Sequence, residues 1–467
     1  MKKIMCLLVI LVMITLTACK ETAKPISDNQ SDSTASVESI KDTESVESIE
    51  GMKNNKAPMN IVQVQPKALM ETKYGESYPA ATTAAKGAND FAFRLSAELA
   101  NQNGNKNFVC SPYSVWIPLA ALVNATDAKN KAKLLAALST AGISEADLNY
   151  AASRMLYDLT RQRDKKLIEQ YGEDYYYNPL KISNAIFVGN NVTLKKDFAQ
   201  TFMDYYRGSS INVDFRSKEA VDAVNKWASE NTEGLITDIV REFDPNTVAT
   251  IVNAIYFSDR WSQEFNPDNT KQDVFYSPKG ETKAFYMLRE GNSLPYYEDN
   301  KIQAIQLGFT KGGGMYIILP KDGDAIDLLS SMTSKYFEKI QEDSVKASGR
   351  LLLPRFSINS DSLSLKDTLI KLGVPLFDEK SAPLTGGLIE ENIPVWLSSA
   401  MHRAVINVDE KGTTAAAVTA LIAVTKGKYR PTHSFEMICN KPFVFVLYGN
   451  THDGKTQILF TGIVNQP

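Results

Sequence analysis

The chain has 467 residues, of which 43% are hydrophobic and 22% are charged, and its formal net charge is −3 at pH 7. These values are ordinary for a soluble globular protein, and the near balance of charge gives no reason to expect a nucleic-acid partner. The sequence contains no zinc-type spacing of Cys and His, no phosphate-binding glycine loop and no Gly-x-Ser-x-Gly elbow. We therefore expect a protein without cofactor, metal or catalytic activity.

The first nineteen residues resemble a bacterial lipoprotein signal. Lys2 and Lys3 precede an apolar run at residues 7–16, and LTAC ends at Cys19. In such signals the cysteine is acylated and becomes the first residue. Residues 1–18 are thus predicted to be removed, and Cys19 to hold membrane lipid on the outside of the cytoplasmic membrane, at the cell envelope. A simple secretion signal or a retained anchor stays open, although the run is shorter than the roughly 20 residues that span a bilayer.

Residues 19–80 differ in composition from the rest of the chain. They are rich in Ser, Thr, Glu, Asp, Asn and Lys, contain few aromatic residues, and carry SVESI twice, at 36–40 and 45–49. Such a segment cannot bury enough apolar surface to fold. We predict a disordered tether, followed by one folded domain at residues 81–467.

The folded part shows both helical and strand patterns. Helical spacing occurs at residues 91–99, 114–122 and 133–138. Apolar strand patterns occur near Ile182, Ile251, Ile317, Leu353 and Phe445. Because these elements do not alternate as regular βαβ units, the predicted fold class is α+β.

For two further groups of residues, a structural role is favoured over a functional site. A basic run at Arg161, Arg163, Lys165 and Lys166 is surrounded by acidic residues, so a solvated mixed-charge face is favoured over a site for a heparin-like polyanion. Cys110 and a second cysteine, Cys439, lie in apolar strand patterns, where free cysteine behaves as a small hydrophobe. We expect two buried thiols, and a disulfide between them stays open.

The segment EKGTTAAAVTALIAVTKGKYRP, at residues 410–431, combines a stem that can be buried with an exposed end. From Gly412 onward the stem carries small or apolar side chains, no charge and no proline, and could lie in the middle of a sheet. The hydrophilic stretch from Lys426 to Pro431 suits an exposed loop. Ala-rich sequence also favours helix, so a surface helix is an alternative.

Seven motifs in order along the chain resemble those of the serpin family, from about residue 80 to the end. They are NFVCSPYSVWIPLAAL (107–122), VNKWASENTEGLITDIV (224–240), TIVNAIYFSDRWSQEFNPDNT (250–270), IQAIQLGFTKGGGMYIILP (302–320), LLLPRFSI (351–358), HRAVINVDEKGT (402–413) and NKPFVFVLYGNTHDGKTQILFTGIVNQP (440–467).

The resemblance implies a fold of about nine helices and three β-sheets with an exposed reactive-centre loop. It also implies a monomeric, irreversible suicide-substrate inhibitor of serine, and in some cases cysteine, endopeptidases. The protease cuts the loop and forms an acyl-enzyme, and the cut stem then inserts into the central sheet and traps the protease in a covalent complex.

The resemblance further assigns roles to three groups of residues. The hinge of the loop comprises Glu410, Gly412, Thr413, Ala415 and Ala417. The breach, where the strand first inserts, comprises Trp261 and Arg355, with Arg355 and Glu410 as an expected ion pair. The shutter, a polar cluster under the central sheet, comprises Ser111, Ser114, Asn184 and His402.

Counting seventeen residues from Glu410 places the bait bond at Lys426–Gly427. A lysine before the bond suits a trypsin-like target, whose specificity pocket holds a carboxylate. A bond after Lys428, or a bond after Val424 cut by an elastase-like enzyme, stays open. Because the stem that follows from Gly412 carries no charge or proline, an inhibitor is favoured over a non-inhibitory serpin that acts as a surface binding protein.

A secreted hydrolase is the remaining class of function. The three histidines, His402, His433 and His452, lie near no recognisable nucleophile motif and show no metal-ligand spacing. The sequence therefore favours an inhibitor over an enzyme.

Overall fold

The structure is a computed structural model that describes residues 78–160, 179–360, 363–413, 433–451 and 453–467. All of these residues belong to the unit Pro58–Pro467. The described residues form nine α-helices: α1 (Pro79–Asn103), α2 (Pro112–Leu122), α3 (Ala128–Ala137), α4 (Glu145–Thr160), α6 (Lys196–Tyr206), α7 (Lys218–Glu230), α8 (Ala325–Ser331), α9 (Ser334–Glu342) and α10 (Lys366–Lys371). Short 3-10 turns are η1 (Val123–Ala125), η3 (Pro267–Asn269) and η4 (Pro375–Phe377).

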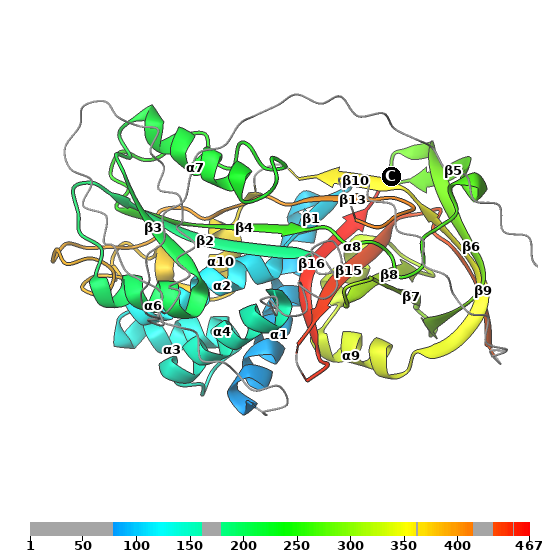
Figure 1. The fold of residues 1–467 in the computed structure, drawn as a ribbon, viewed down its shortest axis with the longest axis horizontal. Helices are drawn as coiled ribbons and strands as arrows, with labels where there is room; N and C mark the ends of the chain where they lie inside the picture. Colours follow the sequence, from blue (N-terminus) through cyan, green and yellow to red (C-terminus); the bar gives the residue numbers. More distant parts are fainter. Residues whose placement is uncertain (1–77, 161–178, 361–362, 414–432, 452) are drawn as a thin grey trace, which may run out of the picture. The chain divides into compact units, whose positions relative to one another are not determined.

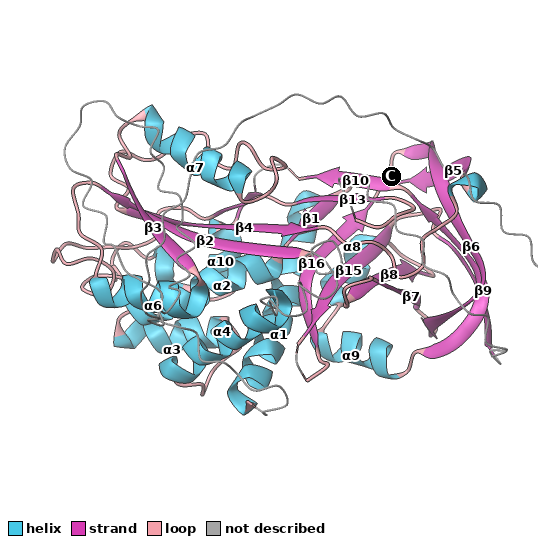
Figure 2. Ribbon diagram, viewed as in Figure 1, coloured by secondary structure: helices cyan, strands magenta, loops and turns pink. Residues whose placement is uncertain are grey.

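The largest sheet in the described residues has nine strands. Its order is β1 (Phe108–Cys110), β16 (Thr456–Val464), β15 (Phe443–Asn450), β8 (Gly314–Pro320), β7 (Ile302–Gly308), β6 (Gly280–Glu298), β9 (Val345–Pro354) and β14 (His433–Ile438), with β5 (Lys271–Ser277) paired to β6. Neighbouring strands are antiparallel except β14 and β9, which are parallel. Figure 2 shows these strands on one side of the view and most of the helices on the other.

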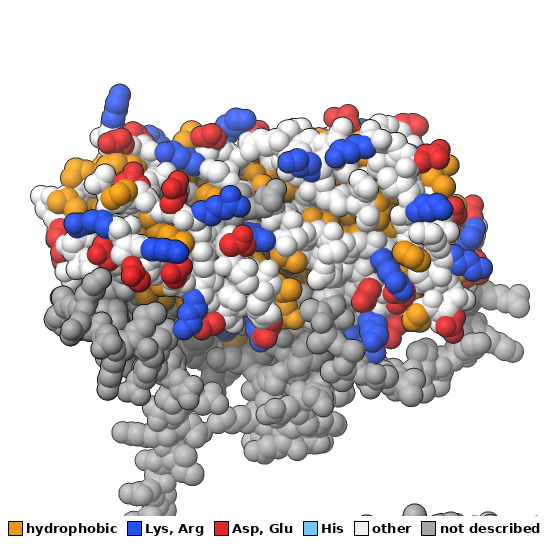
Figure 3. Space-filling view, turned by 90° about the horizontal axis from the view of Figure 1, so that it is seen from above, with side chains coloured by type: hydrophobic (Ala, Val, Ile, Leu, Met, Phe, Trp, Pro, Cys, Tyr) orange, Lys and Arg blue, Asp and Glu red, His pale blue; other side chains and the backbone are white. Residues whose placement is uncertain are grey.

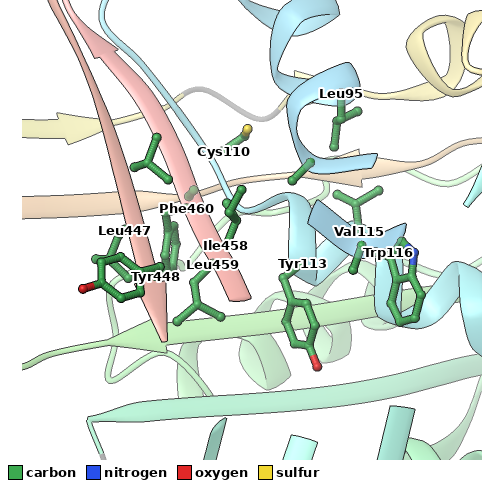
Figure 4. Packing of buried hydrophobic residues seen from close by; sticks show 14 of the residues in the cluster. Leu95, Cys110, Tyr113, Val115, Trp116, Leu447, Tyr448, Ile458, Leu459 and Phe460 are labelled. Carbon is green, nitrogen blue, oxygen red and sulfur yellow. The ribbon is translucent and has the colours of Figure 1, made fainter. Parts of the chain in front are cut away.

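The centre of the nine-stranded sheet is buried on both faces. All seven residues of β8 are buried, and β15 and β16 are buried along nearly their whole length. Side chains of α1 and α2, such as Leu95 and Trp116, belong to the same core as Leu459 and Phe460 of β16 (Figure 4). Strands covered on both faces carry continuous apolar runs, which explains why these sequences do not alternate.

Helix α2 is apolar on every side because the core surrounds it. Ten of its eleven residues are buried. The helix begins at Pro112, and the side chain of the preceding residue, Ser111, accepts a hydrogen bond of 3.3 Å from the Ser114 N–H. A serine cap and a proline in the first turn both favour a helix start at this point. This start places two serines inside the core.

A three-stranded sheet lies between two layers of helices (Figure 1). Its order is β3 (Gly208–Val213), β2 (Leu180–Gly189) and β4 (Ala249–Phe257). Helix α7 covers one face, where Val224 packs in one cluster with Val252 of β4. On the other face Ile186 and Ile255 belong to the main core. Side chains of β4 thus alternate between two separate apolar clusters.

Two further sheets have two strands each. They are β10 (Phe356–Asn359) with β13 (Val405–Val408), and β11 (Leu363–Ser364) with β12 (Met401–His402). Met401 of β12 and residues 250–252 of β4 line the same cavity of about 30 Å³. Val405 of β13 packs against the apolar cluster that contains Val224 of α7 and Val252 of β4. Strand β13 therefore runs near β4 (Figure 1). Within the described residues, however, β4 pairs only with β2, and β13 only with β10.

The structure confirms the α+β class, and its described residues contain nine helices, whereas the sheets are divided differently from the expected three. The described strands form four sheets, because no ladder joins β4 to β13. The strand patterns are all present, but LLLPRFSI forms two strands, with Arg355 between the end of β9 at Pro354 and the start of β10. The third helix starts earlier than the periodicity indicated, at Ala128, where the Asp127 side chain caps it.

Candidate functional site

The described residues of the hinge, Glu410, Gly412 and Thr413, belong to a tight turn and its exit directly after β13. The N–H of Asp409 donates to the carbonyl oxygen of Gly412 at 3.0 Å. The Asp409 carboxylate accepts from the N–H groups of Lys411 and Gly412 at 2.8 and 3.2 Å. Gly412 has a φ of +150°, which favours glycine. The chain therefore reverses direction immediately after β13.

The same turn pairs with the residues that follow β4. The N–H of Trp261 donates to the carbonyl oxygen of Lys411 at 2.8 Å, and the N–H of Thr413 donates to that of Asp259 at 2.9 Å. An antiparallel bridge joins Arg260 to Gly412. The hinge thus lies between the end of β4 and the end of β13 and is hydrogen-bonded to the backbone at both ends.

The ion pair expected between Arg355 and Glu410 is present. The Nε of Arg355 donates to both carboxylate oxygens of Glu410 at 2.8 Å, and the Thr270 hydroxyl donates to the same carboxylate. Burial raises the pKa of the Glu410 carboxyl, but the hydrogen bonds from Arg355 and Thr270 outweigh burial and hold the pKa below its ordinary value. The side chain of Arg355 is 45% exposed and that of Glu410 only 7%, so the pair lies at the edge of the core.

Trp261 fills the space beneath the hinge. It is 1% exposed, and its ring stacks on Phe309 with centroids 4.7 Å apart and planes 9° apart. Its indole N–H donates to the carbonyl oxygen of Asp409 at 2.9 Å. The structure therefore brings Trp261, Arg355 and the hinge together, as the resemblance implied.

Three of the four expected shutter residues form one buried group. The Nε2 of His402 accepts a hydrogen bond of 3.0 Å from the N–H of Ser111, so the ring proton is on Nδ1, 3.5 Å from the Ser114 hydroxyl. Burial lowers the pKa of His402 to about 4. The imidazole is thus neutral at pH 7.

The fourth shutter residue, Asn184, has other partners. It donates to the carbonyl oxygen of Tyr206 at 2.7 Å and accepts from Asn253 of β4 at 2.7 Å. The Oδ1 of Asn253 is buried without a hydrogen-bond partner in the described part of the chain. Sequence reasoning missed Asn253. The sequence feature that could have identified this residue is an amide in the middle of the apolar strand TIVNAIYF.

Several predicted site residues lie outside the described residues. They are Cys19, Ala415, Ala417, Val424, Lys426, Gly427 and Lys428, together with His452 and the basic run at residues 161–166. On the face seen in Figure 3, basic and acidic side chains are interspersed.

Both cysteines in the described residues are free and buried, as expected. Burial raises the pKa of the Cys110 thiol to about 11, and it raises that of Cys439 further. Reactive cysteines have depressed pKa values and some exposure, so these two thiols are structural.

The described residues contain neither a metal-type cluster of side chains nor a membrane-spanning helix. No group of three or more His, Cys, Asp or Glu side chains has the arrangement of a metal site. No helix in the described part of the chain has the length and apolar character needed to cross a membrane.

Comparisons with known proteins agree with this geometry. A family model described as Serpin (serine protease inhibitor) matches residues 86–467. The chain is 29% identical over 388 residues to an uncharacterized serpin-like protein of Methanosarcina acetivorans, with 81% of this chain and 85% of that protein covered. It is 28% identical over 403 residues to the plasma serine protease inhibitor of Bos taurus, with 85% and 94% covered.

Solved structures show the same fold. Tengpin, a thermophilic serpin in its native state, superposes with a TM-score of 0.70 at 24% identity, over 82% of this chain and 94% of that one. The fold is therefore that of a serpin, with the hinge between the edges of two sheets. The chain belongs to the serpin family, whose members are in general protease inhibitors rather than enzymes.

Proposed function

We propose that this serpin is an irreversible suicide-substrate inhibitor of serine endopeptidases. The observation that carries the proposal is the hinge, which is bonded to the ends of both β4 and β13 while no ladder joins these two strands in the described residues. A strand that continues from the hinge has two edges to pair with. Insertion of the loop between them is a case of strand addition, for which serpins are an established example.

Two contacts set the register of such a strand. The turn from Asp409 to Gly412 fixes its pairing with β13, and the bridge between Arg260 and Gly412 fixes its pairing with β4. Both pairings are antiparallel. When both registers are continued along the stem, the pairing with β4 and the pairing with β13 assign each stem residue to the same face of the sheet.

The stem sequence fits the two faces. In this register Ala417 lies between Ile255 and Ala404, both buried in the main core. Ala416 and Val418 then face helix α7. Because these positions carry small or apolar side chains, their burial leaves no uncompensated polar group.

The same register brings Thr419 between Asn253 and His402. The Oδ1 of Asn253 is the buried acceptor without a partner in the described part of the chain, and a threonine hydroxyl can donate to it. An unsatisfied buried polar group is costly in a folded protein. The inserted state therefore supplies a donor that the described residues of the intact state lack.

The energy of insertion is large. About a dozen residues joining two strand edges, at roughly 1 kcal/mol net for each hydrogen bond, give on the order of 10 kcal/mol before side-chain burial. Such a difference corresponds to a factor of about ten million in equilibrium. Insertion after cleavage is thus effectively one-way.

For the bait we propose Lys426–Gly427 and a trypsin-like target. The proposal rests on the count from Glu410, and its support is that Glu410 forms the ion pair with Arg355 beside the turn after β13. Bonds after Val424 and Lys428 are the alternatives, with an elastase-like enzyme for the first.

The test is to mix the full chain with trypsin-like and elastase-like serine proteases and with a cysteine protease. A complex that survives SDS, and a released peptide that begins at Gly427, are expected with the trypsin-like enzyme. A protease without its active-site serine is the control. Cleavage without a complex contradicts inhibition, and a peptide with another first residue moves the bait bond.

We further propose that Cys19 carries lipid and holds the protein at the cell envelope, with residues 20–80 as a spacer. The support is the signal-like sequence that ends in LTAC. The full-length protein should partition into the detergent phase of a two-phase extraction, and Cys19→Ser should partition into the aqueous phase. Equal partition of the two proteins contradicts the proposal.

A further inference from the structure

Asp259 is a fully buried side chain two residues after the end of β4, with 0% exposure. Its Oδ1 accepts hydrogen bonds from the Arg260 N–H at 2.8 Å and the Thr310 hydroxyl at 2.6 Å. Its Oδ2 accepts from the Lys311 N–H at 3.0 Å. Hydrogen bonds to a charged acceptor are about twice as strong as neutral ones. A buried side chain with three such bonds fixes the groups around it.

Two of these donors belong to the turn between β7 and β8. This turn also bonds to the backbone after β4, since the N–H of Thr310 donates to Arg260 at 2.9 Å and the N–H of Ser262 donates to Gly308 at 2.8 Å. One edge of the segment after β4 is therefore joined to the β7–β8 turn, which is part of the nine-stranded sheet.

The opposite edge of this segment holds the hinge. The carbonyl oxygen of Asp259 accepts from the Thr413 N–H at 2.9 Å, and the Asp259 N–H donates to the Thr413 hydroxyl at 3.3 Å. Thr413 is 5% exposed. One residue thus holds the β7–β8 turn through its side chain and the first residue of the loop stem through its backbone.

We propose that Asp259 is a positioning residue that sets the register in which the loop stem inserts, an inference that rests on the proposed function. By fixing the end of β4 against the β7–β8 turn, the carboxylate keeps the edge that receives Thr413 in one place. Register matters because a slip of one residue moves every side chain to the other face. A slipped stem would point Ala416 and Val418 into the main core and Ala417 toward α7.

The test uses Asp259→Asn in the full chain. Asparagine keeps the size of the side chain but replaces one acceptor oxygen with an NH₂ group that faces N–H donors. A synthetic peptide with the sequence TAAAVTALIAVT, residues 414–425, is added to the intact protein. Its incorporation, followed by native electrophoresis and by the rise in Tm, should slow roughly tenfold, the loss expected from one charge-assisted hydrogen bond.

A second readout separates positioning from folding stability. The number of inhibitor molecules consumed for each protease trapped should rise, because slower insertion lets more acyl-enzyme hydrolyse. The rate constant for the first encounter with the protease should stay unchanged, because Asp259 is outside the bait segment. A lower Tm of the intact protein with unchanged incorporation and consumption overturns the inference, as does faster incorporation.

Matched variants complete the design. Thr310→Val removes one donor to the carboxylate and should slow incorporation less than Asp259→Asn, and the double variant should be no slower than Asp259→Asn alone. Asp268→Asn, at an exposed position, is the control and should behave as wild type. A wild-type protein that neither takes up peptide nor traps protease overturns the proposed function and this inference together. Normal wild-type behaviour with unaffected Asp259 and Thr310 variants overturns this inference alone.

Discussion

Gly412 lies so close to Asp259 that a Cβ atom on the glycine would be 2.2 Å from the Asp259 carbonyl oxygen. That distance is far below van der Waals contact. Together with the positive φ at Gly412, it means that both space and backbone conformation require glycine in the hinge.

The substitution Gly412→Ala should therefore destabilise the intact protein by about 2 kcal/mol or more, measured by chemical or thermal unfolding. Gly454→Ala is the control, because Gly454 has a φ of +73° but no atom within 4 Å of its ideal Cβ. Gly454→Ala should lower the free energy of unfolding only by the cost of a non-glycine residue at positive φ, about 1 kcal/mol. Equal losses in the two variants would show that the contact with Asp259 does not matter.

The ion pair between Arg355 and Glu410 should contribute about 1 kcal/mol at pH 7, since one partner is half-exposed. The pKa of Glu410 is lower in the folded protein than its ordinary value of 4.5. The contribution is thus present above pH 4.5 and is lost as the pH falls through the folded-state pKa. The difference in Tm between wild type and Arg355→Met should narrow over that range.

Lys181→Met provides the comparison for this pair. Lys181 and Glu233 form an ion pair whose side chains are 53% and 52% exposed, and such exposed pairs contribute little. A loss of stability in Lys181→Met as large as that in Arg355→Met would contradict the special role of the pair at the hinge.

His402 should make the protein sensitive to mild acid. Burial lowers its pKa to about 4 from an ordinary value of 6.5, so between these pH values the unfolded chain binds a proton that the folded protein does not. Stability should decline as the pH falls through this range, by about 3 kcal/mol in total. His402→Gln should flatten the decline in unfolding curves recorded at several pH values. His433→Gln, at an exposed position of β14, is the control and should show the same decline in stability as wild type. If His402→Gln also declines as wild type does, His402 is not the source of the acid sensitivity.

Under the proposed mechanism, Thr413→Arg should give a protein that the protease cuts as a substrate but that does not trap it. Thr413 is buried against Asp259, and a guanidinium at this position would have to be buried without a partner before insertion could proceed. The protease should still cut the loop, but no complex should survive SDS electrophoresis. Thr413→Val, which keeps the size of the side chain, should still form the complex. Trapping by Thr413→Arg at the wild-type level would contradict insertion through the hinge.

The α+β class and the individual strands could be predicted from periodicity, because long apolar segments such as β8 and β15 suit buried strands. The number of helices and sheets came from the resemblance to the serpins. The hinge and breach residues came from the resemblance to the serpins, since nothing local in the sequence links Arg355 to Glu410 across 55 positions. Asn253 and Asp259 were missed for a different reason. One polar residue in a strand or loop is ordinary, and only tertiary packing shows that the Oδ1 of Asn253 and the side chain of Asp259 are buried.

The separation of β4 from β13 could not be predicted from composition either. Each strand has an apolar pattern that suits the middle of a sheet, and the sequence of one strand does not specify its neighbour. Which edges stay apart depends on the turn after β13, whose closeness to the end of β4 appears only in three dimensions.

The turn between Asp409 and Gly412 has a kinetic consequence for the proposed mechanism. A hairpin is slow to start and fast to lengthen, because the first loop closure costs entropy before later pairs compensate for it. Here that first closure is already made in the intact molecule. Growth can then run from a preformed nucleus, and its speed should depend on the stem of this chain and be the same for every protease that cuts the loop at the same bond.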